Sequence, residues 1–586
     1  VSRVKPVVVL KSGRSAQGAK AAASHTGAMA GEDAVYDAAF KRAGIVRVKT
    51  TDEFFNCAEL MAKQRRPAGP KIVIITNSGG PGVMGADAVA EYGLELSSIK
   101  PQQLEELSRI LPPHWSHGNP VDILGDATAE RYVEVINCCF EAKDPDGILL
   151  IINPQAMTNQ AQLATALSES LKGRPYPIFA ALMGGRDVLE GVRILNDAGV
   201  PTYHTPEEAI RSFMYLYEYE RNLKMLQEVP PRLHHDIKPE KRQAQKIIQE
   251  GLERERGLLS EVESKTVLAA YGIPVNRTEI AESEDRASEL ASEVGYPLVM
   301  KVHSLEVSHK TEAGGVELNL QNGEEVRQAY RRVLEAVQAY QPDSEILGVT
   351  LQSMVQNPDY EILMGAKKDP RFGPVILFGM GGIFAEVLGD RALALPPLNR
   401  NLAHLLMRET RVYRLLEGYR NRHAANMESL EKMLIGLSML VVDFSAIVEL
   451  DMNPVVIKEG SACAVDARIV VRTSDTPSPH HLVISPYPSH LESEEVTSTG
   501  LRIFIRPVKP EDAPLFVDFF ETLSPTSIYY RFFSSLKSIS SSMLSRFTQI
   551  DYDREVALVA LKTEDGQERM IGVGRIIGDP DGKNGE

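Results

Sequence analysis

Residues 1 to 225 alternate short runs of valine and isoleucine with longer stretches that have the apolar periodicity of amphipathic helices. Parallel sheets produce this alternation, because each buried strand is followed by a helix that returns the chain to the same edge. The alternation therefore predicts a doubly wound α/β fold. The predicted strands include residues 7–10, 71–75, 147–152 and 177–182.

A short pattern occurs twice in this region. Ala43-Gly44-Ile45 leads through a predicted strand to Thr51-Asp52-Glu53, and Ala198-Gly199-Val200 leads through another to Thr205-Pro206-Glu207-Glu208. The repeat predicts two similar subdomains side by side, which meet near residues 65–70. The alternative is that it reflects only the general likeness of all βα units.

The chain is longer than one hydrophobic core supports. At 586 residues it is expected to form about three or four domains. We predict a first subdomain at 1–66, a second at 67–225, a charged helical connector at 226–256, a mixed unit of helices and strands at 257–475, a linker rich in proline, serine and acids at 476–499, and a last unit at 500–586.

Both ends of the sequence interrupt a predicted element. Residue 1 is valine, and the segment from Lys5 to Lys11 already has the composition of a buried strand. At the other end, the segment from Met570 to Ile577 predicts a strand, and the sequence stops soon after it. We therefore expect the chain to be a fragment of a longer protein.

Charge and cysteine content exclude several classes of function. The net charge of −15 argues against nucleic acid or an anionic membrane as the main partner, since both require a basic surface. Four cysteines without metal-ligand spacing do not make a disulfide framework, so we expect a reducing, cytoplasmic location. No apolar run approaches the roughly 18 residues that a membrane span requires.

His25 is a candidate catalytic residue. It lies in Ser24-His25-Thr26-Gly27-Ala28, where a helix is predicted to begin, after the small-residue loop Lys11-Ser12-Gly13-Arg14-Ser15. Backbone N–H groups at a helix N-terminus and in a glycine-rich turn favour negative charge, so a phosphoryl group on His25 would be stabilised there. The alternative is an ordinary histidine at a helix cap.

This segment closely resembles the active-site segment of ADP-forming acetyl-CoA synthetases, which are relatives of succinyl-CoA synthetase with a transiently phosphorylated histidine. Asn77-Ser78-Gly79-Gly80-Pro81-Gly82 and Asn119-Pro120-Val121-Asp122 look like a further domain of that family. The resemblance implies two flavodoxin-like subdomains, a phosphoryl group on His25, and phosphate binding by Gly27, Gly79 and Gly80. Plain turn geometry is the alternative for the glycines.

The unit at 257–475 carries a second set of candidates. Lys301 ends a predicted strand and is followed by His309-Lys310-Thr311-Glu312-Ala313-Gly314-Gly315, and a lysine beside a Gly-Gly turn is suited to clamp nucleotide phosphates. Asn453, just past a strand, and Asp466, on the next strand, offer the hard oxygen ligands that Mg²⁺ prefers. For Asn453 and Asp466 the alternative is a capped turn.

These residues together resemble an ATP-grasp domain, in particular the β-subunit portion of the same synthetase family. The resemblance implies that Asp451 positions the phosphohistidine and that His309 is a second histidine that shuttles the phosphoryl group. It also implies the following ligands: Lys301, Gly314, Gly315, Gln352 and Glu361 for the nucleotide, and Asn453 and Asp466 for Mg²⁺.

The last unit resembles the N-terminal half of a GNAT acetyltransferase. An alternating strand begins at Leu501 and runs into an acidic helix start at Glu511-Asp512, and a second strand follows at residues 556–561. The glycine-rich turn with which that family binds acetyl-CoA comes after a later strand, beyond Glu586.

Two functions from different classes compete. In the first, the chain is an ADP-forming acyl-CoA synthetase that uses ATP/ADP, Mg²⁺, phosphate and CoA, is fused to a GNAT domain, and forms a homo-oligomer. In the second, it is a Pat-type protein lysine acetyltransferase whose synthetase-like region is a regulatory acyl-CoA sensor. A sensor has no physical need for two histidines together with Asp451, Asn453 and Asp466, which favours the synthetase. Because the CoA-binding domain that precedes this region in the family is not in the sequence, we expect histidine phosphorylation without the CoA step.

Overall fold

The structure is a computed structural model of the 586-residue chain. It describes residues 2, 5–15, 17, 18, 20, 32–141, 144–155, 159–228, 237–254, 257–307, 310–382, 388–564 and 567–579. The chain divides into two compact units, of which the first comprises residues 1–33 and 40–226 and the second residues 34–39 and 227–586. Each unit has hydrophobic cores of its own.

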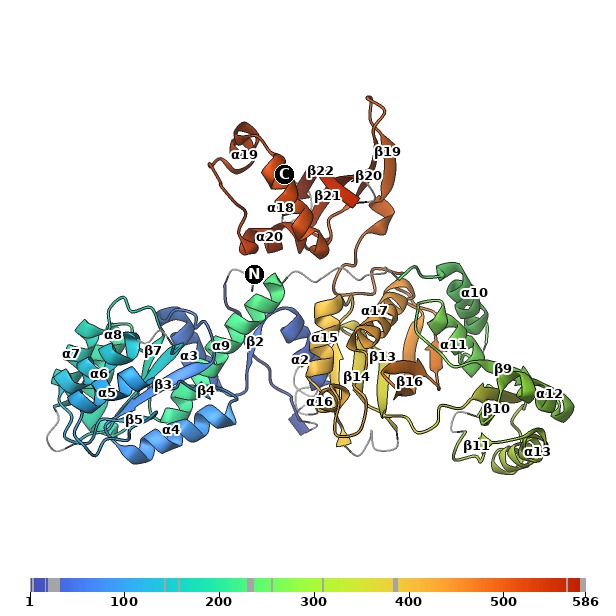
Figure 1. Cartoon of the computed structure of the whole chain (residues 1–586), viewed down its shortest axis with the longest axis horizontal. Helices are drawn as coiled ribbons and strands as arrows, with labels where there is room; N and C mark the ends of the chain where they lie inside the picture. The colour runs from blue at the N-terminus through green and yellow to red at the C-terminus, as the bar shows by residue number, and fades with distance from the viewer. Residues whose placement is uncertain are drawn as a thin grey trace. The chain divides into compact units, whose positions relative to one another are not determined.

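The first unit is built on a six-stranded parallel sheet with strand order β4-β3-β6-β7-β8, in which β5 also pairs with β3 (Figure 1). Successive residues of each central strand pack into different cores, so Ile72 and Ile74 face one helical layer and Val73 and Ile75 the other. Burial on both faces explains why these strands are continuous apolar runs. The strands are β3 Lys71–Thr76, β4 Glu95–Leu96, β5 Val121–Asp122, β6 Gly147–Ile152, β7 Ile178–Leu182 and β8 Thr202–Tyr203.

Helices cover both faces of this sheet. One core joins it to α5, α6, α7 and α8, and the other joins it to α3, α4 and α9. The helices are α3 Thr51–Lys63, α4 Gly79–Glu91, α5 Pro101–Ile110, α6 Ala129–Glu141, α7 Gln160–Ser170, α8 Leu189–Asp197 and α9 Pro206–Gln227. The doubly wound arrangement predicted from the sequence is confirmed for this sheet.

The repeated sequence pattern corresponds to a repeated local structure. Helix α2 (Asp33–Arg42) leads to β2 (Val46–Val48), which pairs in parallel with β1 (Val8–Leu10). Gly44 has φ +66° and donates its N–H to Lys41 O at 3.0 Å, while Gly199, between α8 and β8, has φ +86° and donates to Asn196 O at 3.0 Å. Glycine adopts this left-handed conformation without steric cost, so it ends both helices in the same way.

The second unit contains a six-stranded antiparallel sheet with order β15-β14-β13-β16-β17, in which β18 also pairs with β16 (Figure 1). One face packs on helices α10 Lys241–Leu252, α11 Glu261–Ala269, α15 Arg400–Arg408, α16 Val412–Leu416 and α17 Met427–Asp443. Because strand residues alternate between faces, Leu450 and Met452 enter this core and Asp451 and Asn453 lie on the opposite face. The strands are β13 Tyr360–Asp369, β14 Gly373–Met380, β15 Arg391–Ala394, β16 Ile447–Lys458, β17 Ser461–Ala464 and β18 Arg468–Val471.

A smaller antiparallel sheet, with order β11-β10-β12-β9, shares a core with α12 Glu284–Val294 and α13 Gly323–Tyr340. Its strands are β9 Thr278–Ala281, β10 Leu298–His303, β11 Val316–Leu320 and β12 Gly348–Ser353. Lys301 lies inside β10, where it pairs with Thr350 of β12, and not at the end of a strand as predicted. Strand β10 continues because its backbone is paired on both sides.

Two further positions on strands differ from the prediction. Asn453 lies within β16, which continues through Pro454 to Lys458. The proline is tolerated because the register between β16 and β13 shifts between Ile362 and Met364, and such a bulge needs no hydrogen bond from it. Asp466 lies in the loop between β17 and β18 and not on a strand.

The last part of the second unit is a four-stranded antiparallel sheet, β19-β20-β21-β22. Its elements are β19 Ser493–Val496, β20 Arg502–Pro507, α18 Ala513–Thr522, α19 Pro525–Phe532, α20 Ser541–Thr548, β21 Glu555–Glu564 and β22 Gln567–Ile577. Strand β19 occupies part of the predicted linker at 476–499. It was missed because an edge strand of Ser, Glu, Glu and Val has almost no apolar alternation. In the described part of the chain, no helix has the length and apolarity that a membrane crossing requires.

Candidate functional site

A buried carboxylate brings three lysines together in the second unit. Glu261, the first residue of α11, accepts hydrogen bonds from Lys301 Nζ at 2.8 Å on Oε1 and from Lys310 Nζ at 2.8 Å on Oε2. Lys265 Nζ, one helical turn further along α11, lies 3.0 Å from Oε1. The side chain of Glu261 is only 1% exposed, so the four charges interact away from bulk water.

The ionisation of this cluster follows from its composition. Burial alone would raise the pKa of Glu261, but the ammonium groups of Lys301, Lys310 and Lys265 hold it well below the usual range. Burial likewise works against the charge of Lys301, whose pKa is nevertheless raised by Glu261 and Asp466. Three cations therefore surround one anion, and the excess positive charge is suited to a phosphate group.

Lys265 fixes the inner side of the cluster. Its Nζ lies 2.7 Å from Asn276 Oδ1, 3.1 Å from Thr278 Oγ1 and 3.0 Å from Gln352 Oε1. Gln352 in turn donates from Nε2 to Glu261 Oε1 at 2.6 Å. Burial lowers the pKa of Lys265 to about 8. Gln352 is thus part of a closed polar network.

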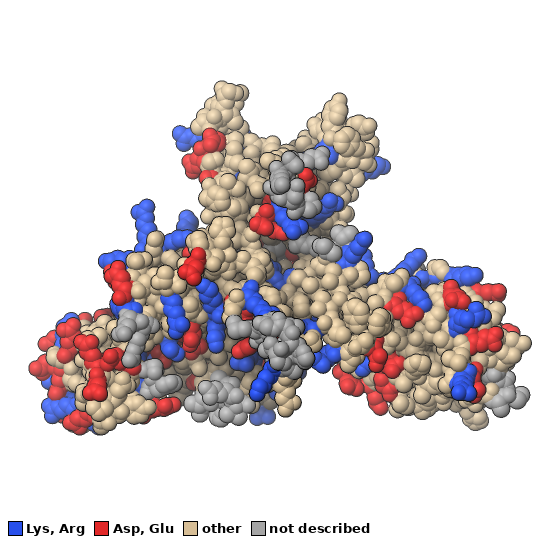
Figure 2. Space-filling model, turned by 180° about the vertical axis from the view of Figure 1, so that it is seen from behind, with Lys and Arg blue, Asp and Glu red and all other residues tan. Residues whose placement is uncertain are grey.

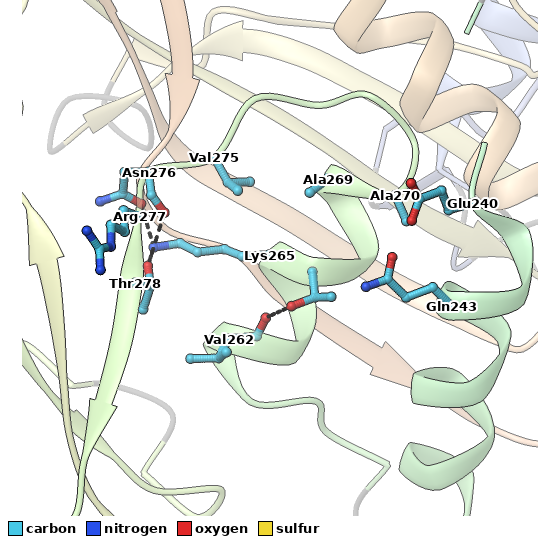
Figure 3. A pocket seen from close by; sticks show the side chains of 11 residues that line it. Glu240, Gln243, Val262, Lys265, Ala269, Ala270, Val275, Asn276, Arg277 and Thr278 are labelled. Atoms are coloured by element: carbon cyan, nitrogen blue, oxygen red, sulfur yellow. Dashed lines mark hydrogen bonds between the residues drawn. The ribbon is translucent and has the colours of Figure 1, made fainter. Parts of the chain in front are cut away.

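The same lysine lines a cavity of about 390 Å³. Figure 3 shows Lys265 extending from its helix toward Asn276 and Thr278, with Gln243 on the neighbouring helix α10 and Glu240 just before that helix begins. Since the ammonium of Lys265 is already bonded to Asn276 and Thr278, the cavity is adjacent to the cluster but does not hold its phosphate-binding side.

Lys301 also connects the cluster to the predicted metal ligands. Its Nζ lies 3.2 Å from Asp466 Oδ1 and donates to Val465 O at 3.1 Å. Asn453 Oδ1 accepts the backbone N–H of Gly382 at 3.1 Å. Asp451 lies on the same strand face as Asn453, and burial together with Asp466 and Glu449 raises its pKa to about 6, against the effect of Arg468.

Glu361 lies on this sheet face as well. Gly382 has φ +71°, and a Cβ placed there would collide with the carboxylate of Glu361. The turn at Gly382 therefore depends on glycine, and it brings Glu361 and Asn453 against one backbone segment.

Gly314 and Gly315 shape the turn that carries Lys310. Gly314 has φ +65° and donates to Thr311 O at 3.2 Å, and Gly315 donates to Lys310 O at 2.7 Å. A Cβ on Gly315 would lie 3.0 Å from Lys310 O and 2.8 Å from a methyl group of Val302. In this structure the turn uses both N–H groups, so these glycines act through the position of Lys310.

In the first unit, Gly79 and Gly80 open helix α4 at the carboxyl end of β3. A Cβ on Gly79 would lie 3.0 Å from Asp122 Oδ2, whereas a Cβ on Gly80 would meet no atom within 4 Å. The helix N-terminus at the edge of a parallel sheet is a position that favours anions.

A cavity of about 570 Å³ lies beside the loop after β1. It is lined by Leu10, Lys11, Ser12, Gly13, Arg14, Ser15, Gly18, Lys49, Thr50 and Thr51. Asp33 lies 3.2 Å from Lys11 Nζ and 2.6 Å from an Arg47 nitrogen, and burial, which raises its pKa, is outweighed by these two cations, which lower it. His25, Gly27 and His309 lie outside the described residues.

Sequence reasoning missed Glu261 and Lys265. The spacing of a glutamate four residues before a lysine, directly after the helix cap Ser260 with Glu263 at the third helical position, is visible in the sequence. Such pairs are common on exposed helix faces, so nothing local indicates that this one is buried against β10. Among the described residues there is no group of three or more His, Cys, Asp or Glu that could hold a metal ion.

Charged side chains of both signs lie on the surface of the chain (Figure 2). Figure 2 shows basic and acidic side chains interspersed on the face in view.

Three ranges match known domain families. Residues 1–61 match the succinyl-CoA ligase like flavodoxin domain, residues 72–227 the Ligase-CoA domain and residues 250–471 the ATP-grasp domain. An ADP-forming acetate–CoA ligase of Methanocaldococcus jannaschii is 37% identical over 485 residues, which is 80% of this chain and 68% of that protein. The chain belongs to the ADP-forming acetyl-CoA synthetase family. The flavodoxin-like and ATP-grasp predictions are thereby confirmed.

Other members of the ADP-forming acetyl-CoA synthetase family match to a similar extent. ADP-forming acetate–CoA ligase I of Archaeoglobus fulgidus is 38% identical over 80% of this chain and 67% of its own length. ADP-forming 4-hydroxybutyrate–CoA ligase of Nitrosopumilus maritimus is 37% identical over 79% of this chain and 66% of its own length. The chain thus spans about two thirds of the length of these relatives. The GNAT resemblance of residues 500–586 stays a prediction.

Proposed function

We propose that this chain carries the phosphoryl-transfer part of an ADP-forming acyl-CoA synthetase, in which acyl-CoA, ADP and phosphate are converted reversibly to acid, ATP and CoA. The observation that carries the proposal is the convergence of Lys301 and Lys310 on Glu261, next to Asp466. Charge-assisted contacts of this kind bind polyphosphates, and phosphoryl transfer is mostly positioning and charge stabilisation.

The reaction divides into four transfers. An oxygen of phosphate attacks the thioester carbonyl of acyl-CoA, and the C–S bond breaks. The CoA thiol leaves, and an acyl phosphate remains. A ring nitrogen of His25 then attacks phosphorus and releases the carboxylate. The phosphoryl group passes to His309 and finally to the terminal oxygen of ADP, which becomes ATP. A neutral imidazole is available for each attack near pH 7.

The residues on the sheet face fit Mg²⁺. Asn453 supplies an amide oxygen and Asp466 a carboxylate that is 45% exposed on its side chain, so it is accessible to an ion. Mg²⁺ in nucleotide sites uses one or two protein oxygens and completes its shell with phosphates and water. When bound, it would neutralise phosphate charge, while Asp451, Lys301 and Lys310 orient the transferring groups.

The arrangement of the site favours the synthetase over the regulatory sensor. Asp466 contacts Lys301 and also acts on Asp451, an arrangement that a sensor of acyl-CoA does not require. For the last unit, predicted at residues 500–586, we retain the GNAT-like interpretation, supported by three helices between β20 and β21 and by antiparallel pairing of β20, β21 and β22. An acetyltransferase activity on protein lysines would need its own demonstration.

Histidine phosphorylation tests the proposal. We expect the chain to take up acid-labile label from ATP labelled at the γ-phosphate in the presence of Mg²⁺, and to transfer it to added ADP. His25→Ala should lower the label to what His309 alone retains, and His25→Ala combined with His309→Ala should abolish it, whereas His114→Ala, a change at an exposed turn residue, should leave it intact. Absence of label in the unaltered chain, or equal label in His25→Ala, would contradict the proposal.

A further inference from the structure

We propose that Glu261 is a positioning residue that holds Lys301 and Lys310 apart at the spacing needed for nucleotide phosphates. The inference deepens the proposed function and rests on it. Glu261 is not expected to touch the nucleotide itself, since its side chain is 1% exposed and lies behind the two lysines, whose side chains are 11% and 21% exposed.

The distribution of hydrogen bonds supports this role. Lys310 donates to Oε2 of Glu261, whereas Lys301, Lys265 and Gln352 share Oε1. One planar carboxylate therefore assigns each lysine its own oxygen. Without it, two neighbouring ammonium groups would repel each other and separate.

The placement of Glu261 on α11 makes the arrangement rigid. It is the first helical residue after Ser260, whose hydroxyl accepts from Glu263 N at 3.2 Å and whose own N–H donates to Glu263 Oε2 at 2.8 Å. This capping box fixes the start of the helix, and the helix N-terminus favours a carboxylate there. Lys301 comes from β10 and Lys310 from the turn before β11, so Glu261 links three separate segments.

A purely structural role explains the cluster less well. Buried ion networks contribute little stability compared with apolar residues of the same volume, because removing charges from water is costly. Three lysines around one glutamate also leave an excess of positive charge, which a fold has no need of but a polyphosphate does. Asp466, which contacts Lys301 from the loop after β17, offsets only part of that excess.

Glu261→Gln tests the inference by a change of charge with little change of shape. A carboxamide offers one oxygen and one NH₂ group, so one of the two lysines faces a donor. We expect the affinity for ADP, measured by displacement of a fluorescent ADP analogue from the intact chain, to fall about tenfold, as for the loss of one charge-assisted hydrogen bond. Displacement by adenosine, which has no phosphates, should change less than about twofold.

Glu263→Gln is the matched control. Glu263 lies on the same helix and binds Arg254 at 2.5 Å and 2.8 Å, but it is not among the partners of the three lysines. It should leave ADP affinity within about twofold of the unaltered chain. Equal loss in both variants, an equal loss for adenosine, or tighter ADP binding in Glu261→Gln would each overturn the positioning role, the last by showing that Glu261 competes with phosphate.

A double variant keeps the test valid if Glu261→Gln folds poorly. Glu261→Gln with Lys265→Met removes one negative and one positive charge, so the net charge of the cluster is unchanged. Stability should recover, but ADP should still bind about tenfold more weakly than to the unaltered chain, because Lys301 and Lys310 still lack their shared acceptor. Recovery of affinity together with stability would overturn the inference. If the unaltered chain does not bind ADP at all, the proposed function fails with it, which is a distinct result.

Discussion

Glu261, which is buried, and Asp451, which is half-buried, are two carboxylates of the same unit whose environments shift their pKa values in opposite directions. Burial alone would raise both pKa values. Around Glu261 three ammonium groups reverse that effect and lower its pKa well below normal. Around Asp451 the acidic neighbours Asp466 and Glu449 add to it, so the pKa rises to about 6 in spite of Arg468.

The difference separates two tasks within one site. A carboxylate that stays ionised at neutral pH can organise cations without changing its charge. A carboxyl group with a pKa close to neutrality changes protonation in response to its neighbours, which suits a group that meets an imidazole before and after phosphorylation. Asp466 connects the two carboxylates, since it contacts Lys301 of the lysine cluster and also raises the pKa of Asp451.

The largest effect on stability should come from Glu261→Gln. Removing one partner of a buried charge network leaves uncompensated charge, so we expect the free energy of local opening at α11 to fall by about 3 kcal/mol at pH 7. The measurement is amide hydrogen exchange of α11 and β10 in the intact chain, because the single tryptophan, Trp115, lies in the first unit and does not report on the second.

The pH dependence gives the sign of this effect. The folded-state pKa of Glu261 is below its ordinary value of 4.5, so its stabilisation is present above that pH and is lost as the pH falls through the folded-state pKa. Glu263→Gln, which breaks an ion pair with Arg254 that is partly accessible to solvent, should cost less than about 1 kcal/mol. Equal destabilisation by the two changes would remove the distinction between Glu261 and an ordinary helical glutamate.

Asp451→Asn should change the stability in the opposite direction from Glu261→Gln, and by a smaller amount. The folded-state pKa of Asp451 is raised from 3.8 to about 6, so the folded state binds more protons between these values and wild-type stability falls as pH rises through them. The Asp451→Asn variant does not lose stability in this pH range. It should be more stable at pH 7 by on the order of 2 kcal/mol in metal-free buffer and lose its advantage near pH 4. Hydrogen exchange of β16 measures the effect, and a variant less stable than the unaltered chain at pH 7 would contradict it.

The fold was predictable wherever the signal is periodic along the chain. Strands β3, β6 and β7 are apolar along their central positions because both faces are covered, and this made them visible as runs. Strand β19 was not visible, since Ser493 to Val496 owe their structure to pairing with β20 and not to burial.

The sequence pointed to individual candidate residues but not to the network that the structure forms around them. Lys301, Asn453 and Asp466 were singled out because their chemistry and local sequence are distinctive. Glu261 was missed because its importance lies in contacts with residues 40 and 49 positions away, which no local pattern encodes. The raised pKa of Asp451 likewise depends on an acid on another loop, which only the folded chain brings near.

The smallest predicted effects concern the neighbours of Asp451. Asp466→Asn removes a negative charge and should lower the pKa of Asp451, whereas Arg468→Gln removes the opposing cation and should raise it further. Each change should alter local stability by less than about 1 kcal/mol, because Asp466 and Arg468 are partly exposed and solvent screens them.

The direction of each shift is the informative result. Carbon-13 NMR of the aspartate side-chain carboxyls, with Asp451→Asn used to assign the resonance, gives the titration midpoint directly. Lys367→Gln, a change on the neighbouring strand β13, serves as a charge control, since Lys367 pairs with Glu449 in the strand register and not with Asp451. If Asp466→Asn leaves the midpoint near 6 while Lys367→Gln moves it, the elevation comes from burial and general charge. In that case Asp466 would not be the residue that joins the cationic and the acidic parts of the site.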